Sequence, residues 1–159
     1  MLTDDSKHYL ECSILCWLAT VDAEGCPNVS PKEIFTYDAA DDIWVAQLAS
    51  PQSARNIRRR PAVCLSFIDV FVQKGYKIKG TARLVAADDP AFSAQAERLR
   101  QLAGPDFPFR EMIGITPTQI EPIVAPSYRF RPATTELAQV RNALQTYGVR
   151  EWLTKVEQL

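Results

Sequence analysis

The sequence has little of several features that would assign it to a functional class at once. Its 159 residues carry 18 basic and 19 acidic side chains, so the formal net charge is only −1. A protein with this balance has no overall field to attract nucleic acid or an anionic membrane, and we expect neither partner. No apolar run approaches the ~18 residues of a membrane span, and the first residues are acidic where a secretion signal is basic. We therefore expect a soluble, cytoplasmic protein.

Metal-binding and disulfide patterns are also missing. The four cysteines have no CxxC spacing and are expected to be free thiols, three of them within segments that read as buried helix or strand. The single histidine, His8, is spaced with Cys12 and Cys16 at i, i+4 and i+8, which on one helix would form a stripe of metal ligands. However, the segment 14–20 is rich in β-branched and aromatic residues and favours a strand, and no fourth zinc ligand lies nearby. We expect no metal site.

One basic cluster, Arg58-Arg59-Arg60, lacks the interleaved aromatic residues that stack on bases. It stands at the end of a predicted helix, where basic side chains complement the helix dipole, so we expect a solvated surface. With 47% apolar residues the chain can bury a core, and it shows no repeat, low-complexity tract or interdomain linker.

The order of predicted elements is a short helix followed mostly by strands. Closely spaced strands indicate an antiparallel meander, and the proline-rich span 105–132 favours only broken edge-strand pieces. The expected helices are 4–11, 51–60, 89–103, 134–147 and 149–156; the expected strands are 15–21, 27–37, 43–48, 62–69 and 75–86, with edge pieces at 119–124 and 127–130.

Three separated motifs lie in the first half of the chain. Leu18–Lys32 reads as a strand, a Glu-Gly turn and a returning strand, and Ala49–Ile57 carries a Ser-Pro helix start. Gly75–Arg83 is a strand with alternating basic residues. In this order and spacing the motifs resemble the flavin-binding split-barrel family typified by pyridoxamine 5'-phosphate oxidase.

The resemblance implies a mainly β fold with peripheral helices, a six-stranded antiparallel split barrel of the FMN-binding type. It implies a single domain over residues 1–159, with the barrel core at about 14–131 and C-terminal helices at about 134–157. It also implies FMN as cofactor, and a homodimer in which both subunits contribute to each flavin site.

The resemblance places the flavin ring against the strand that contains Val29, Ser30, Pro31, Lys32 and Glu33. A proline within a strand removes a ladder donor, so Pro31 marks a sheet edge where a ring could lie. Lys32 would then hold positive charge near the N1–C2 carbonyl edge of the ring and raise its reduction potential. The alternative is a solvated edge lysine paired with Glu33.

The second motif suits the phosphate tail of FMN. A helix N-terminus presents free N–H groups, and the matching residues are Ala49, Ser50, Gln52, Ser53 and Asn56. The alternative is that Ser50 only caps the helix and Asn56 is a polar surface residue. Oxidases of the family carry Arg-Lys where this chain has Gln52-Ser53, so phosphate neutralisation is expected from Arg55, Lys77 or a partner subunit.

The sequence also departs from the oxidases elsewhere. It has Asn28 and Glu33 where their ring strand has Arg and Lys, and its one histidine is far from their C-terminal Arg-x-His motif. Pyridoxamine 5'-phosphate is therefore not the expected substrate. The hypothesis is an FMN-dependent oxidoreductase with an unknown substrate and no identified catalytic side chain. The alternatives are a flavin-binding electron carrier or storage protein, or a split barrel that binds deazaflavin or haem.

Overall fold

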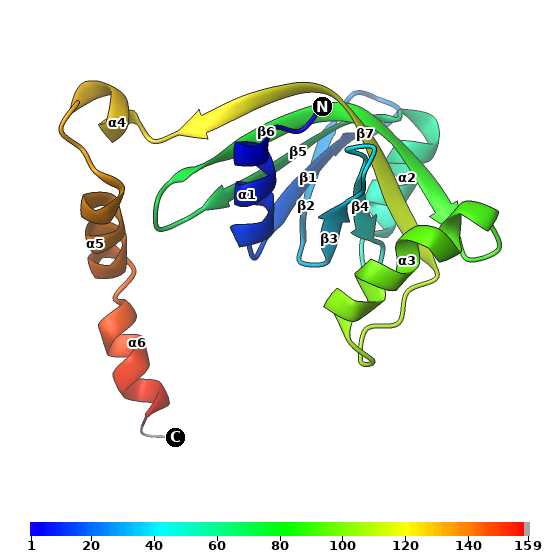
Figure 1. The fold of residues 1–159 in the computed structure, drawn as a ribbon. Coiled ribbons are helices and arrows are strands. Elements are labelled where there is room, and N and C mark those ends of the chain that lie inside the picture. The colour runs from blue at the N-terminus through cyan, green and yellow to red at the C-terminus, as the bar shows by residue number, and fades with distance from the viewer. Residues whose placement is uncertain (158–159) are drawn as a thin grey trace.

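A computed structural model describes residues 1–157, which form one curled antiparallel sheet with helices around it (Figure 1). The strands are β1 (Cys16–Val21), β2 (Pro27–Lys32), β3 (Phe35–Tyr37), β4 (Ile43–Ala46), β5 (Ala62–Asp69), β6 (Lys74–Ala86) and β7 (Glu111–Val124). The helices are α1 (Asp4–Cys12), α2 (Pro51–Arg59), α3 (Pro90–Ala103), α4 (Pro126–Phe130), α5 (Glu136–Thr146) and α6 (Val149–Val156).

The strand order explains why the sheet curls. The order is β2-β1-β5-β6-β7-β4-β3, and every pairing is antiparallel. The two edge strands, β2 and β3, are consecutive in the chain and are separated only by Glu33 and Ile34. Two residues span at most about 10 Å, so the opposite edges of the sheet must approach each other. The predicted split barrel is thus confirmed.

Two details of the prediction are wrong. The sheet has seven strands rather than six, because the predicted strand 27–37 breaks at residues 33 and 34, where the chain passes from one edge to the other. The order is also not a meander, since β1 pairs with β5 and β4 pairs with β7. The predicted edge position of Pro31 is confirmed, because β2 has only β1 as a neighbour.

The proline-rich span is the largest correction. Residues 111–124 form one strand that pairs with β6 along its whole length, while residues 127–130 are helical rather than extended. The strand tolerates Pro117 and Pro122 because β4 pairs only with its first part, Met112–Ile115. Pro117 also lies at the register shift beside Lys79 and Gly80, where a bulge removes the need for a ladder donor.

The barrel interior is apolar and fully enclosed. Its centre is built from alternate residues of the strands, and α3 forms a second cluster mainly with residues of β4, Val85 of β6 and Met112 of β7. The most buried central side chains are Leu18, Ile43, Leu65, Phe67, Ile78, Ile113 and Ile115. The expectation of three buried cysteines is wrong: Cys16 is buried, Cys64 is half-buried, and Cys12 and Cys26 are exposed.

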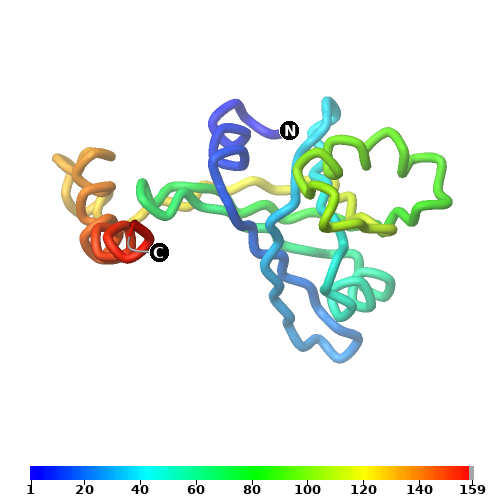
Figure 2. The backbone as a smooth tube through the Cα atoms, turned by 90° about the horizontal axis from the view of Figure 1, so that it is seen from below, coloured from blue at the N-terminus to red at the C-terminus, as the bar shows by residue number. Residues whose placement is uncertain are grey.

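The C-terminal helices stand apart from the barrel in both views (Figures 1 and 2). They are attached to the tip of the β5–β6 hairpin, where Tyr128 donates to the Val72 carbonyl at 2.8 Å and Lys74 pairs with Glu136 at 2.7 Å. No helix within residues 1–157 is long and apolar enough to cross a membrane.

Candidate functional site

A cleft of about 480 Å³ opens where β2 ends. Its wall includes both segments that the sequence predicts for a cofactor: Pro31, Lys32 and Glu33 come from the edge strand, while Ala49 and Ser50 precede α2. The opposite wall is apolar and comes from the end of α3 and the loop that follows it, with Leu102, Ala103 and Phe107. Nothing in the sequence pattern had linked this later segment to the site.

Lys32 is the most unusual residue of the cleft. It faces inward because it is opposite Cys16 in the β1–β2 register, and its side chain is only 6% exposed. Its Nζ donates to Ser50 Oγ at 2.5 Å and to Gln47 Oε1 at 3.4 Å. Among residues 1–157 no carboxylate pairs with it, and burial lowers the pKa of its ammonium group. The alternative of a solvated Lys32 paired with Glu33 is therefore wrong.

The two residues before α2, Ala49 and Ser50, reach the same cleft. Ser50 is the N-cap residue, yet its side chain makes no capping hydrogen bond because it accepts from Lys32 instead. Pro51 occupies the first turn, and the following N–H groups have no side-chain acceptor from the cap. Gln47, which sequence reasoning missed, fixes this arrangement by donating from Nε2 to the Ser50 carbonyl at 2.6 Å.

Ser53 and Asn56 occupy a different place from the one expected. Both are buried, with Asn56 only 2% exposed, so the alternative of a surface Asn56 is wrong. Ser53 Oγ lies 2.9 Å from Ser30 Oγ, and Asn56 Nδ2 donates to Thr20 Oγ1 at 3.0 Å. Gln52 donates to Asn56 Oδ1 at 2.8 Å. These hydrogen bonds attach α2 to β1 and β2, and the three polar side chains do not line the cleft.

Val29 and Lys77 lie on the outer face of the sheet. The register places Pro31, Trp17, Ser66 and Lys77 in one row across four strands, three spacings or roughly 14 Å from end to end. Lys77 pairs with Glu121 at 2.8 Å and does not line the cleft. A role for either residue in cofactor binding stays a prediction that involves a second subunit.

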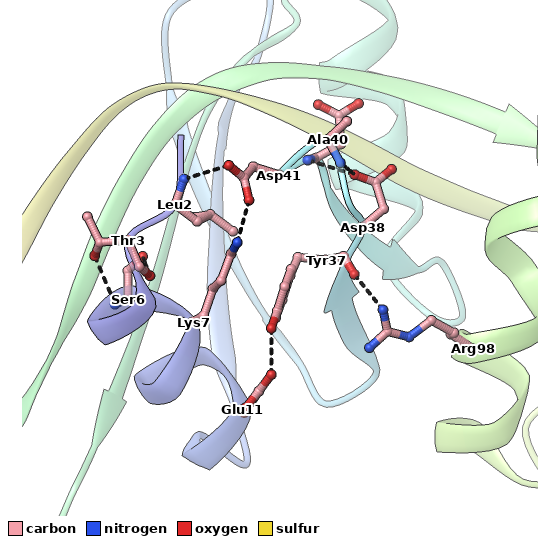
Figure 3. Close-up of polar contacts among 11 residues, drawn as sticks. Leu2, Thr3, Ser6, Lys7, Glu11, Tyr37, Asp38, Ala40, Asp41 and Arg98 are labelled. Atoms are coloured by element: carbon pink, nitrogen blue, oxygen red, sulfur yellow. Dashed lines mark hydrogen bonds and ion pairs between the residues drawn. The ribbon is translucent and has the colours of Figure 1, made fainter.

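A second cleft of about 470 Å³ adjoins the first and shares Ser13, Glu33 and Leu102 with it. Figure 3 shows its polar wall: the Tyr37 hydroxyl donates to Glu11 at 2.6 Å, and Arg98 donates to the Tyr37 carbonyl at 3.0 Å. The bond to Glu11 raises the pKa of the Tyr37 hydroxyl. These contacts join α1, β3 and α3, which are distant in sequence, so no local pattern could reveal them.

Beside this wall, the loop before β4 is fixed by Asp41. Its carboxylate accepts from the Leu2 amide at 3.2 Å and pairs with Lys7 at 2.8 Å (Figure 3). The hydrogen bond from Lys7 lowers the pKa of the Asp41 carboxyl group. The N-terminus is thereby held against the loop that leads into the sheet, and α1 becomes a rigid side of the second cleft.

The histidine–cysteine stripe does not form. His8 and Cys12 are neighbours on α1, with Nδ1 3.8 Å from Sγ, while Cys16 is buried in β1. Burial raises the pKa of the Cys16 thiol to about 12. Within the described part of the chain no three His, Cys, Asp or Glu side chains are grouped to bind a metal ion.

The protein is thus an antiparallel split barrel with a cleft where an edge strand meets the segment before a helix. The sequence pattern of the pyridoxamine 5'-phosphate oxidase family matches residues 2–123, more than three-quarters of the chain. The protein belongs to this family. The match ends just before α4, so the C-terminal helices lie beyond it.

Solved structures support the fold. HupZ from Group A Streptococcus superposes with a TM-score of 0.67 at 23% identity, over 77% of this chain and 100% of that chain. An FMN-binding protein from Syntrophomonas wolfei gives a TM-score of 0.64 at 14% identity, over 76% and 84%. An F420 reductase gives 0.59 at 24% identity, over 76% and 98%. At these identities the likeness shows the fold alone. Comparison with curated proteins gives no match.

Proposed function

We propose that this protein is an FMN-binding flavoprotein that acts as an oxidoreductase on a small molecule other than pyridoxamine 5'-phosphate. The observation that carries the proposal is the buried Lys32 ammonium group, which lines the cleft without a carboxylate partner among residues 1–157. A buried charge without a counter-charge costs several kcal/mol, so this site favours a ligand with an electron-rich or anionic edge.

The residues present fit FMN. A cleft of about 480 Å³ is within the range of ligand sites, and it combines the apolar side chains of Pro31 and Phe107 with hydrogen-bond donors at one end. Lys32 and Ser50 supply side-chain donors, and α2, whose first-turn N–H groups are suited to a phosphate, begins directly after Ser50 at the margin of the cleft. The names of the Syntrophomonas wolfei protein and the F420 reductase support a flavin or a deazaflavin as the ligand.

When bound, FMN supplies an N5 atom that accepts or gives a hydride or electrons. The chain contributes placement and electrostatics. Lys32 stabilises negative charge on the reduced ring, and the hydrogen bonds of Ser53 and Asn56 hold α2 in position to receive the phosphate. No general acid or base is assigned, because hydride transfer through the cofactor does not require one.

The second cleft favours an enzyme over an electron carrier. An electron carrier needs only an exposed ring edge, whereas the adjoining 470 Å³ space offers a small molecule a place beside the first cleft, with Tyr37 and Arg98 as polar contacts. Carrier and storage roles remain the second candidate.

We further propose that a homodimer shares each flavin site. Support comes from the outer face of the sheet, where Trp17 and Val29 are exposed and Lys77 lies too far along the row to reach the cleft of its own chain. A second subunit would cover Trp17 and Val29, and Lys77 would then lie near the flavin site of that second subunit.

The test is the absorption spectrum of the purified protein followed by titration of the apoprotein with FMN. Bands near ~370 and ~450 nm and quenching of FMN fluorescence are expected for a bound oxidised flavin. Lys32→Met should weaken binding at least tenfold, whereas Lys79→Met, a matched change of an exposed lysine, should not. A strong Soret band would identify the cofactor as haem instead of FMN. Tighter binding of a deazaflavin than of FMN would identify it as a deazaflavin.

A further inference from the structure

The C-terminal arm, defined as residues 126–157 with α4, α5 and α6, lies outside the family match. The family match ends at residue 123, and HupZ matches over its whole length while covering 77% of this chain. The arm nevertheless consists of three helices that begin and end with recognisable signals: Pro126 opens α4, Thr135 caps α5, and Gly148 in the left-handed region separates α5 from α6.

The base of the arm is fixed to the barrel. Beside the Tyr128 hydrogen bond and the Lys74–Glu136 ion pair, Gln139 donates to Gln73 Oε1 at 2.6 Å, and the Tyr147 ring packs edge-on against Phe71 with centroids 6.4 Å apart. These contacts all involve the tip of the β5–β6 hairpin and end at residue 147. The arm therefore leaves the barrel in a defined direction.

Beyond that base, α6 has a largely exposed apolar stripe, with the Lys155 ammonium group of the same helix 4.9 Å from the centroid of the Trp152 ring. Val149, Trp152, Leu153 and Val156 follow the i, i+3, i+4, i+7 spacing of one helix face, and none of the residues of α6 is buried. Trp152 is 63% exposed, Leu153 58% and Val156 63%. A helix of 8 residues is marginal alone, since most helix stability in proteins comes from packing of an apolar face. The stripe requires a cover.

The barrel of the same chain does not supply it. The large exposed apolar residues on the outer sheet face, Trp17 and Val29, lie on β1 and β2, whereas the arm follows β7. Four strand spacings, roughly 19 Å, separate β7 from β2. The fixed base holds α5 and α6 to one side of the sheet in both views (Figures 1 and 2).

We propose that the arm docks on a second copy of this chain, with the α6 stripe against the outer face of β1 and β2 around Trp17 and Val29. The proposal rests on the homodimer proposed above. Charge favours this occupant over a membrane or nucleic acid, because the segment 136–157 carries three acidic and three basic side chains, and Arg129 and Arg131 bring the net charge of the whole arm to only +2. The apolar helix face fits the apolar face around Trp17 and Val29, and farther along the same face Glu121 pairs with Lys77 at 2.8 Å and lies 3.9 Å from Lys79.

The area is sufficient for a stable dimer. The exposed apolar side chains of the arm are worth about 100 Å² each when covered, or roughly 400 Å² per arm. In a two-fold dimer both arms engage, and each covers an equal area of the partner, so the total is roughly 1,600 Å². That is the size of a standard specific interface. The four residues that give this area are Leu137, Trp152, Leu153 and Val156.

The test compares two full-length variants by sedimentation velocity over a dilution series. Leu153→Glu puts a charge in the stripe and is expected to raise the dimer dissociation constant at least tenfold. Thr154→Glu introduces the same residue one position later on the opposite face of α6 and should leave the constant within twofold. Because both positions are exposed, neither substitution should unfold the subunit, which far-ultraviolet circular dichroism checks.

The acceptor surface is tested by a double-mutant cycle with Trp17→Glu. If α6 packs on Trp17 of the second copy, the effects of Trp17→Glu and Leu153→Glu will be less than additive. Additive effects would place the arm elsewhere and overturn the proposed acceptor. If the wild-type protein is a dimer and Leu153→Glu does not weaken it, docking of the arm is overturned but the homodimer is not. If the wild-type protein is a monomer at all concentrations, both are overturned. FMN titration of the same samples reports the flavin site separately.

Discussion

A buried lysine weakens a fold unless something compensates its charge, and Lys32 is such a residue. Its hydrogen bonds to Ser50 and Gln47 use two of the three ammonium donors and do not neutralise the charge. The lowered pKa has the same cause, because burial disfavours the charged form. A cofactor whose reduced form is anionic would supply the missing charge, so this residue connects stability, pH and reduction potential.

Lys32→Met should therefore lower the reduction potential of bound flavin. At an effective dielectric of ~20 and a separation of ~4 Å, the charge interaction is on the order of a few kcal/mol before desolvation is subtracted. One net kcal/mol corresponds to about 20 mV for a two-electron couple. Spectroelectrochemistry of the variant beside Lys79→Met measures the shift. An unchanged or higher potential would mean that the Lys32 ammonium does not act on the ring.

The same substitution should stabilise the apoprotein. The folded-state pKa of Lys32 lies below its value of about 10.5 in the unfolded chain, so the folded state binds fewer protons between those two values and stability rises with pH through that window. At neutral pH the charge is a cost, and Lys32→Met should raise the free energy of unfolding by about 1 kcal/mol. Urea unfolding at pH 7 and pH 10 checks this: the advantage of the variant should shrink at the higher pH. If the difference in the free energy of unfolding between the variant and the wild-type protein is the same at both pH values, the effect comes from packing and not from the charge.

The four thiols should react at different rates according to how deeply each is buried. Cys12 and Cys26 are exposed, Cys64 is half-buried, and Cys16 is enclosed with a pKa raised to about 12. Because the thiolate is the reactive species, Cys16 should be modified only after unfolding. Titration with a thiol reagent at pH 8 should give two fast groups, one slow group and one that appears in denaturant. Rapid modification of all four would contradict the enclosed position of β1.

At the scale of elements, α2 depends on its attachment to β1 and β2. Asn56→Leu removes the bond to Thr20 and leaves that buried hydroxyl with fewer partners, at a cost of about 1–3 kcal/mol. Because α2 would no longer be held in place, FMN affinity should also fall, about tenfold. Arg59→Ala changes an exposed residue of the same helix and serves as the control. Full stability together with full affinity would show that the buried hydrogen bonds do not position the helix.

Local signals predicted most elements because the determinants were local. Thr3 and Asp89 cap α1 and α3 as expected, and the period-two strands β1, β5 and β6 appear near their predicted bounds. For β7 only the piece 119–124 was predicted, and residues 111–118 were missed because proline disfavours a strand locally. Pairing with a single neighbour beyond Ile115 makes the prolines acceptable. Tertiary context decided the outcome there.

In the candidate site, too, local motifs could be predicted and contacts between distant segments could not. The edge strand and the helix start could be predicted because each is a short contiguous motif, and the structure brings Lys32 and Ser50 together. Phe107 and the Tyr37–Glu11 pair could not be predicted, since they reach the clefts only through the crossing of distant segments, whereas Gln47 acts locally on Ser50 but belongs to no motif. That Ser53 is buried was equally invisible, because a helix start looks the same from sequence whether it faces a cleft or a sheet.

At the scale of the whole molecule, the proposed shared site links assembly to cofactor binding. If a second subunit contributes to each flavin site, the monomer lacks part of its ligand contacts, and FMN binds the dimer better than the monomer. By linkage, FMN then stabilises the dimer by the same factor. Affinity for FMN should consequently depend on protein concentration, which a site within one chain would not show.

Light scattering of the flavin-loaded protein at micromolar concentration should therefore report about twice the chain mass of 17.8 kDa. Dilution of the apoprotein should produce monomer at a concentration where the FMN-loaded protein is still dimeric, because the cofactor adds contacts across the interface. Titrations with FMN at two protein concentrations, one on each side of the dissociation constant, should give a weaker apparent affinity for the more dilute sample. A mass near 17.8 kDa with FMN bound at full affinity would show that one chain forms the site unaided, and Val29 and Lys77 would then have no place in it.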